Sequence, residues 1–462
     1  MNLPNSFVVS IVSVSLLLSV CLNSPMILGA KSIKDRNLQA QLIIGGLNRP
    51  TSMTFLGQDD ILVAEKQGMV QRIVGKNISN IPALNLTSIV NSTGERGVLG
   101  IASSHVWQNN TDKHDNDSNI YLIFTANVNN TDVNNAGNVS CNVKKCDSTN
   151  SVVLSLYHYN YKNGQLVNPT PLVYVPLASN DSIQHIGGAI TVGPDNKIYF
   201  TTGDGRGCEY FENCSSKVAN ITDSNGLIGK GGIFSTDEDA RRDNYNGKTT
   251  NNYYQYAYGI RNSFGLDFDP VTGNLWDTEN GPAFGDEINL VKPGFNSGYA
   301  KVQGIWPITN YSELFNNPPP GFPKGYYFKN GAQGEINFEK IKNFNGKGKY
   351  SSPEFTWNRT VGVTAIKFFN SDKLGKKYEN DLFVGDAFGS IYHFDLNQNR
   401  TGLNLNDSLS DKVANNDDEL HDVLFAQGLA PRGITDMEVG PDGYLYVLLY
   451  GANGSIYKII PK

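Results

Sequence analysis

The sequence predicts an all-β protein built from a repeated unit, and three observations lead to this fold class. From about residue 38 onwards, short runs rich in Val, Ile, Tyr, Phe and Thr recur between Gly, Asn, Asp and Pro, and helical periodicity is almost absent. A unit of turn, apolar strand and Gly-containing loop returns at spacings of several tens of residues. Such a repeat indicates a propeller or a solenoid, and the lack of a leucine-rich or hexapeptide period favours the propeller.

Five segments carry the repeated unit. Most contain a turn such as Pro-Asp-Asn or Pro-Asp-Gly, in which Pro presets φ and Gly or Asn tolerates the positive φ that follows. The five segments are 59–74, 193–205, 269–281, 379–396 and 440–460. The earlier segment 41–47 (QLIIGGL) is placed to pair with the last blade and close the ring. Polar stretches at 107–150 and 304–350 are interpreted as surface insertions within one domain, 38–462.

The first 30 residues are predicted to be a secretory signal peptide or an N-terminal anchor. Residues 7–22 carry no charge, and Gly29 and Ala30 precede a polar segment. A full membrane span needs about 20 apolar residues, so this shorter run favours cleavage or loose anchoring.

Charge and composition limit the class of function. Hydrophobic residues make up 39% of the chain and charged residues 18%, which is ordinary for a globular protein. The formal net charge is −6 at pH 7. A nucleic-acid partner would need a basic face to neutralise its phosphates, so the sequence predicts no nucleic-acid partner.

Cysteines and sequons agree with a secreted or cell-surface protein. Cys21 lies in the predicted signal, and the other four form two close pairs, Cys141 with Cys146 and Cys208 with Cys214. Two short disulfides in an oxidising compartment are the economical interpretation; the alternative is a four-cysteine metal site, for which these spacings are poor. Asn-x-Ser/Thr sequons occur at Asn77, Asn85, Asn91, Asn116, Asn213, Asn220, Asn310, Asn399 and Asn453.

Three glycine-rich stretches end strands of the repeat: QHIGG (184–188), YGIRNSFG (258–265) and TENGPAFGDEIN (278–289). In a propeller, loops at strand ends converge at one mouth of the central channel. Taken singly, each polar residue in these loops also fits a structural role, such as a turn. Their order, each after a strand, indicates a shared site. The residues expected to converge are His185, Arg261, Asn262, Asn280 and the backbone of Gly281–Pro282.

The same motifs resemble those of the soluble glucose/sorbosone dehydrogenases, quinoproteins that bind pyrroloquinoline quinone (PQQ). The resemblance covers about residues 40 to 460. It rests on LNRPTSMTF (47–55), GERGVLGIA (94–102), HIGGAITVGPDNKIYFTTGDG (185–205), YGIRNSFGLDFDPVTGNLWDTENGP (258–282), DEINLV (286–291) and DMEVGPDGYLYVL (436–448). The family fold is a six-bladed β-propeller, and the resemblance implies that fold here.

The resemblance also implies the chemistry of the site. His185 matches the catalytic base that takes the proton from the anomeric hydroxyl of an aldose sugar, a task that suits neutral imidazole. Arg261 matches the arginine beside substrate and cofactor, whose fixed charge favours negative charge on the quinone oxygen. The carbonyls of Gly281 and Pro282 match the ligands of a calcium ion that lies against PQQ. Such an ion would polarise the quinone carbonyl and assist hydride transfer.

Further positions follow from the same resemblance. Asn262 and Asn280 match polar cofactor contacts. Trp357 matches an aromatic residue that lines the pocket. Asp286 and Glu287 match acidic positions near a second, structural calcium ion.

Some positions differ from the family pattern. Glu95 lies where Gln or Glu contacts the site, but Gln184 replaces the Asp that glucose-oxidising members have before the histidine. The family supplies a Lys and a pair of Arg in the last two blades to neutralise the three PQQ carboxylates. Here the Lys position falls near Phe388, and the Arg pair is reduced to Arg432. Each charge-assisted contact that is lost costs about 1.5–3 kcal/mol.

Two functions from different classes follow. The first is an exported sugar dehydrogenase that depends on PQQ and calcium and passes electrons to an external acceptor. The second is a catalytically inactive extracellular propeller that binds a ligand or a partner. His185, Arg261 and Gly281–Pro282 favour the first, which we adopt; the missing Lys and Arg favour the second. A lactonase would need a set of axial carboxylates and amides that these motifs do not present. Whether the chain forms a homodimer is left open.

Overall fold

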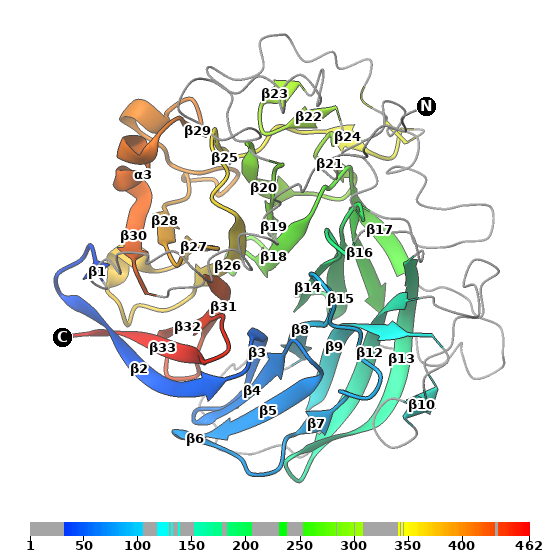
Figure 1. Cartoon of the computed structure of the whole chain (residues 1–462). Helices are drawn as coiled ribbons and strands as arrows, with labels where there is room; N and C mark the ends of the chain where they lie inside the picture. The colour runs from blue at the N-terminus through cyan, green and yellow to red at the C-terminus, as the bar shows by residue number, and fades with distance from the viewer. Residues whose placement is uncertain are drawn as a thin grey trace, which may run out of the picture.

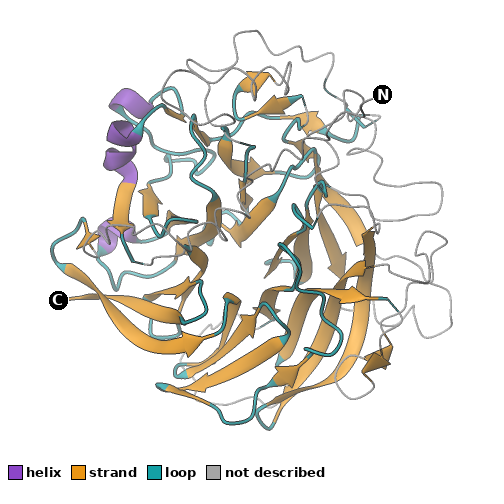
Figure 2. Cartoon of the chain, in the orientation of Figure 1, coloured by secondary structure: helices purple, strands orange, loops and turns teal. Residues whose placement is uncertain are grey.

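The computed structural model describes residues 32–104, 118–128, 131–132, 137–138, 152–177, 183–205, 231–237, 253–282, 284–299, 301–307, 341, 343–344, 346–429 and 433–462. Within these ranges the chain is mostly strand, with one short α-helix, α3 (Asp417–Val423), at the outer edge (Figures 1 and 2). Sheets are arranged around a central axis (Figure 1). The predicted all-β propeller is confirmed.

The sheets of the first half follow one another along the chain, each beginning with its innermost strand. The first contains β3 (Pro50–Gly57), β4 (Asp60–Glu65), β5 (Met69–Val74), β6 (Asn77–Ile78) and β7 (Leu84–Asn85). The next contains β8 (Val98–Ser103), β9 (Asn119–Asn127), β12 (Val152–Lys162) and β13 (Gln165–Leu177). It is followed by β14 (Gly187–Val192), β15 (Lys197–Thr202), β16 (Gly232–Asp237) and β17 (Tyr253–Tyr258), extended by β21 (Phe295–Asn296) and β24 (Lys349–Tyr350).

The second half continues the same plan. One sheet contains β18 (Ser263–Phe268), β19 (Leu275–Glu279), β20 (Asp286–Val291), β25 (Phe355–Trp357) and β29 (Val413–Ala414). Another contains β26 (Val363–Phe369), β27 (Asp381–Asp386), β28 (Ile391–Phe394), β30 (Leu424–Gln427) and β1 (Ser32–Ile33). The last contains β31 (Ile434–Val439), β32 (Leu445–Leu449), β33 (Gly454–Pro461) and β2 (Leu38–Leu47). Two small hairpins, β10–β11 (Thr131–Asp132, Gly137–Asn138) and β22–β23 (Val302–Gln303, Trp306–Pro307), lie outside these sheets.

The innermost strands form a closed circle. β3 contacts β8, β8 contacts β14, β14 contacts β18, β18 contacts β26, β26 contacts β31, and β31 returns to β3. The last sheet joins both parts of the chain, because β2 pairs antiparallel with β33 from Leu38–Pro461 to Leu47–Gly454. The prediction that segment 41–47 pairs with the last blade is therefore confirmed.

Side-chain hydroxyl groups link five of the six pairs of neighbouring sheets. In each case a Thr or Ser hydroxyl of one sheet donates to a backbone carbonyl of the next. These bonds are Ser52 to Ile101 (3.4 Å), Thr201 to Ser263 (3.1 Å), Thr278 to Thr364 (2.7 Å), Thr364 to Ile434 (2.6 Å) and Thr435 to Pro50 (3.0 Å). Because apolar packing has no fixed direction, such bonds help to set the register between sheets.

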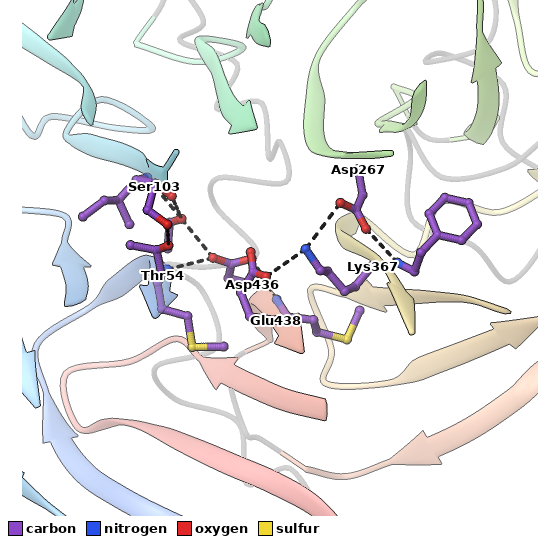
Figure 3. Close-up of polar contacts among 11 residues, drawn as sticks. Thr54, Ser103, Asp267, Lys367, Asp436 and Glu438 are labelled. Atoms are coloured by element: carbon purple, nitrogen blue, oxygen red, sulfur yellow. Dashed lines mark hydrogen bonds and ion pairs between the residues drawn. The ribbon is translucent and has the colours of Figure 1, made fainter. Parts of the chain in front are cut away.

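A polar cluster joins the inner strands near their C-terminal ends (Figure 3). Lys367 Nζ lies 2.8 Å from Glu438 Oε2 and 3.3 Å from Asp267 Oδ1. Asp436 Oδ2 accepts from Ser52 Oγ at 2.9 Å, which ties the last sheet to the first. Burial and the charge of Glu438 raise the pKa of Asp436 to about 7. Burial alone would lower the pKa of Lys367, but the charges of Asp267 and Glu438 outweigh burial and raise it.

Several sequence-based predictions fall outside the described residues. These are the signal or anchor segment, both cysteine pairs, Arg432 and most of the two insertions. The part of the chain that is described has no helix both long enough and apolar enough to cross a membrane.

We expect Thr364→Val to destabilise the protein. Its hydroxyl donates to both Gly385 O and Ile434 O, and valine has the same shape without the donor. Leaving these part-buried carbonyls without that donor costs about 1–2 kcal/mol in the free energy of unfolding. Urea denaturation would measure the change. Thr401→Val, at an exposed threonine, is the matched control, and equal stability of the two variants would contradict the role of this link.

Candidate functional site

The loops that carry the predicted site residues lie at one end of the inner strands. His185 precedes β14, while Arg261 and Asn262 precede β18. Asn280 follows β19, which is antiparallel to β18, so the end of β19 lies beside the start of β18. The backbone N–H of Asn280 donates to Asn262 O at 2.9 Å. The structure thus brings together residues that are separated by up to 95 positions in the sequence.

His185 is buried, and its backbone is in the left-handed region with φ +54°. Few residues other than glycine adopt this conformation, and where they do the surroundings must impose it. Its backbone N–H donates to Glu95 Oε2 at 2.6 Å. The neighbouring glycine at 203 is required sterically, because a Cβ there would lie 2.1 Å from His185 O. The residues around the turn therefore fix where the imidazole lies.

The imidazole is oriented by Asp204, which the sequence analysis did not single out. Nδ1 of His185 lies 2.6 Å from Asp204 Oδ1, and both side chains are buried. In the neutral ring, a proton on Nδ1 donates to this carboxylate, so Nε2 is the nitrogen that can accept a proton. Asp204 lies two residues after the end of β15, within TTGDG. An acidic residue between two glycines at a strand end is the sequence pattern that could have indicated its role in orienting the histidine.

Arg261 is held through both its backbone and its side chain. Its backbone N–H donates to Glu279 Oε1 at 2.6 Å. Its Nη1 donates to the carbonyls of Asn280 and Gly281 at 3.0 and 3.1 Å. The guanidinium carbon lies 6.0 Å from the centroid of the Tyr299 ring. Its charge is thus fixed against the carbonyl that was predicted to bind calcium.

The two predicted asparagines take part in this framework. Asn262 Oδ1 accepts from the backbone N–H of Gly187 at 3.1 Å, and its Nδ2 lies 3.4 Å from Glu95 Oε2. Asn280 Nδ2 donates to Val363 O, at the start of β26. These amides connect the loops beside Arg261 to Glu95 before β8, to the start of β14 and to the start of β26.

Asp286 organises the loop that follows Asn280. Its Oδ1 accepts from the backbone N–H of Gly281 at 2.8 Å and from Thr360 Oγ1 at 2.6 Å. Its Oδ2 accepts from the N–H groups of Val361 and Gly362 at 2.8 and 2.7 Å. Protein donors therefore occupy both oxygens of this predicted metal-site residue. Asp286 therefore holds the peptide between Asn280 and Gly281 in place.

Glu287 has a similar environment. Its Oε1 accepts from Gln303 Nε2 at 3.0 Å and from the N–H of Gly304, and its Oε2 accepts from Ser297 Oγ at 2.9 Å and Asn289 Nδ2 at 3.0 Å. Burial raises its pKa to about 8 in spite of these donors. Neither predicted metal-site carboxylate therefore has an oxygen without a donor in this structure.

Three buried carboxyl groups gather behind Arg261 on β19 and β20. Burial raises the pKa of Asp277 to about 7. Burial, then the charges of Glu287 and Asp277, raise the pKa of Glu279 well above its usual value. Both Asp277 oxygens and Glu279 Oε2 have no hydrogen-bond partner among the described residues. Burial therefore disfavours negative charge on these groups, and a cation bound nearby would favour their ionised forms.

The remaining predicted residues lie in different surroundings. Trp357 is fully buried, with its ring 4.8 Å from Phe355 and 5.6 Å from Tyr392, so it packs in the core and does not face an open pocket. Phe388 is 45% exposed and follows β27, whose end pairs with the start of β26 at the same end of the ring. Pro282 is half-buried beside Gly281.

Two basic residues of the first sheet lie at this end as well. Lys66 follows β4, and its N–H donates to Arg49 O at 3.0 Å. Burial and the nearby charge of Arg49 lower the pKa of Lys66 to about 8, while the charge of Glu95 opposes this. Arg49 is exposed. Lys66 lies close enough to Glu95, which holds His185, for their charges to interact, and its Nζ donates to Ser92 O. Sequence reasoning did not consider Lys66 or Arg49.

Residues 47–458 match the sequence profile of the glucose / sorbosone dehydrogenase family. The chain belongs to this family. The match includes every loop described above, so the glucose/sorbosone dehydrogenase framework underlies the whole site.

Individual relatives of this family member are distant in sequence. Quinoprotein glucose dehydrogenase B of Acinetobacter calcoaceticus is 28% identical over 303 residues, covering 61% of this chain and 58% of the relative. Aldose sugar dehydrogenase YliI of Escherichia coli is 28% identical over 211 residues, covering 45% and 44%. The chain thus aligns with about half the length of these curated relatives. The PQQ-bound aldose sugar dehydrogenase of Streptomyces coelicolor shares the fold, with TM-score 0.54, 19% identity and coverage of 94% and 100%.

We expect Gly203→Ala to disturb the His185 turn. The added Cβ would overlap His185 O at 2.1 Å and approach Asn262 Oδ1 at 2.9 Å, and both belong to the buried framework. Overpacking of this kind costs about 1–3 kcal/mol or more. Chemical denaturation would measure the loss. Gly45→Ala is the matched control, because a Cβ there meets nothing within 4 Å; a loss no larger than that of the control would contradict the steric argument.

Proposed function

We propose that this protein is an exported aldose dehydrogenase that uses PQQ and calcium and passes electrons to an external acceptor. The observation that carries the proposal is the buried pair of His185 and Asp204 beside Arg261. Membership of the glucose/sorbosone dehydrogenase family supports it. The names of the quinoprotein and PQQ-bound relatives support the choice of cofactor.

We further propose that the propeller has six blades, as the family resemblance implies. The circle of contacts among β3, β8, β14, β18, β26 and β31 supports this number, since each of these strands begins a separate sheet. The site then lies across the mouth of the ring, at the end where His185, Arg261 and Asn280 lie.

In the proposed reaction, His185 Nε2 takes the proton of the anomeric hydroxyl. Asp204, 2.6 Å from Nδ1, stabilises the imidazolium that forms and keeps the ring in the required orientation. Glu95 keeps the backbone of His185 in its left-handed conformation. Arg261 holds a fixed positive charge beside the reacting groups. Bound PQQ would accept the hydride from the sugar, with calcium as the Lewis acid.

The carbonyls of Gly281 and Pro282 are the proposed calcium ligands, and an ion there would share Gly281 O with Arg261 Nη1, which donates to it at 3.1 Å. Calcium prefers oxygen ligands. A cation nearby would favour the ionised forms of Asp277 and Glu279, whose pKa values are raised chiefly by burial. Asp286 orients the peptide of Gly281 without being a ligand itself in this scheme.

The residues present fit PQQ only in part. Three carboxylates need cations, and the described residues offer Arg261, Lys66 and Arg49 at this end of the ring. Phe388 takes the place of the family lysine and adds no charge. We propose that PQQ binds with an affinity lower than that of members with the full set of cations, because each missing charge-assisted bond removes about 1.5–3 kcal/mol.

The alternative function is an inactive propeller that binds a ligand or a partner. Phe388, 45% exposed at the mouth, favours it because an exposed aromatic residue suits contact with a ligand. This alternative keeps the fold but needs neither His185 nor Asp204 to act on a proton.

The test is a titration of the purified chain with PQQ in the presence of calcium, followed by reduction of an artificial dye with a panel of aldoses. We expect binding and turnover, with calcium chelation abolishing turnover. His185→Ala should lower kcat/KM by about 100-fold or more while PQQ still binds, because the base is lost. Asp204→Asn should lower kcat by at least about tenfold, since the imidazolium loses its partner.

His421→Ala, at an exposed histidine on α3, is the matched control and should leave turnover unchanged. No binding at micromolar PQQ would overturn the cofactor assignment and favour the binding propeller. Binding with turnover that is insensitive to His185→Ala would overturn the role of the histidine alone.

We expect Phe388→Lys to tighten PQQ binding. The new ammonium group would stand where the family has lysine, and at an exposed position a charge-assisted bond is worth about 1 kcal/mol, or about fivefold in Kd. Phe388→Gln separates the effect of charge from loss of the ring. Spectroscopic titration gives Kd without turnover, and equal affinities of the two variants would rule out a contact between residue 388 and the cofactor carboxylates.

A further inference from the structure

A histidine and two aspartates form a compact group on the outer part of the sheet that contains β27 and β28, away from the proposed active site. Leu382 pairs with Phe394 and Phe383 with His393 in antiparallel register. The same register places Asp381 opposite Asp395. His393 and Asp395 are two positions apart and so share a face, which Asp381 also shares.

The donor atoms of this group are as close together as ligands of one ion. His393 Nε2 lies 2.9 Å from Asp381 Oδ2 and 3.5 Å from Asp395 Oδ1. One ligand atom from each of the three residues lies within 4.8 Å of the others. Two atoms bound tetrahedrally to one zinc ion at about 2.1 Å are about 3.4 Å apart. Small side-chain adjustments would therefore suffice to place a metal ion among them.

The charges within the group are unbalanced. Two carboxylates face one imidazole, and like charges placed opposite each other on neighbouring strands are destabilising. Among the described residues, no lysine or arginine forms an ion pair with Asp381 or Asp395. Nearby cations are engaged elsewhere: Lys377 pairs with Asp35 at 2.7 Å and Arg400 with Asp269 at 2.7 Å. The charge of the group is balanced by a proton on His393, by a proton on a carboxyl, since burial and the charge of Asp381 raise the pKa of Asp395, or by a metal ion.

The imidazole is held in position and can be reached from solvent. The rings of Tyr378 and Phe383 lie 5.0 and 5.1 Å from the His393 ring and limit its rotation. His393 also lines a cavity of about 410 Å³, whose lining residues do not include Asp381 or Asp395. The side chain of Asp395 is 55% exposed. An ion bound here would keep open positions for water, as metal sites with three protein ligands do.

We propose that Asp381, His393 and Asp395 bind a divalent transition-metal ion such as Zn²⁺. One imidazole nitrogen and two carboxylate oxygens are a donor set that suits this class of ion. The site lies in a different sheet from Arg261 and Gly281, so it does not rest on the proposed dehydrogenase function.

The test uses the full chain without a histidine tag, stripped of metal by dialysis against a chelator. Isothermal titration with Zn²⁺ and visible absorption with Co²⁺ should both show one site. His393→Ala and Asp395→Asn should each weaken binding at least about tenfold and remove the Co²⁺ signal of this site. Asp395 is exposed, so its substitution leaves folding intact.

Matched controls are His421→Ala and Asp372→Asn, both at exposed residues, and these should bind like the parent chain. Binding that is equally strong in His393→Ala and Asp395→Asn would overturn the proposal and place the ion elsewhere. Absence of any Zn²⁺ or Co²⁺ binding would also overturn it, leaving a protonated His393 as the cation shared by the two carboxylates.

Discussion

Closure of the inner ring is the constraint on which the rest of the structure depends. Each inner strand contacts the next, and hydroxyl groups such as those of Thr278 and Thr364 donate to carbonyls across the boundaries between sheets. These bonds have a direction, so they fix how far one sheet slides or tilts against its neighbour. The loops that carry His185 and Arg261 lead directly into two of these inner strands, β14 and β18. A shift between sheets would therefore change the distances within the site before it exposed any of the core.

Within that ring, carboxylates hold the backbone of the site. Glu95 accepts from the N–H of His185, Glu279 from the N–H of Arg261, and Asp286 from the N–H of Gly281. Each bond is 2.6–2.8 Å long and at least partly buried, so each restrains one residue of the candidate site. Asp277, Glu279 and Glu287 lie together beneath the site, and burial raises their pKa values. A cation bound there would favour the ionised forms of these groups.

The sequence predicted the fold well because turn residues and strand composition are local properties. The repeat after Pro-Asp-Asn or Pro-Asp-Gly located strands such as β15 and β32, and the strand-end motifs predicted that His185, Arg261 and Asn280 would meet. The supporting residues were harder to predict. Asp204 and Glu279 resemble solvated acidic residues until their partners are known. Trp357 was expected to line a pocket, but it is packed in the core. Its burial follows from the pairing of β25 with β20, which a local sequence pattern does not predict. No local sequence pattern predicts the left-handed backbone of His185 either.

The pairing of β2 with β33 has a consequence for how the protein is made. Leu38 and Pro461 are partners in one sheet, although almost the whole chain separates them. The ribosome therefore makes β33 long after β2, and the last sheet stays incomplete until both strands are available. Contacts between such distant segments also form slowly. The ring of a growing chain thus stays open until β33 has been made and can pair with β2.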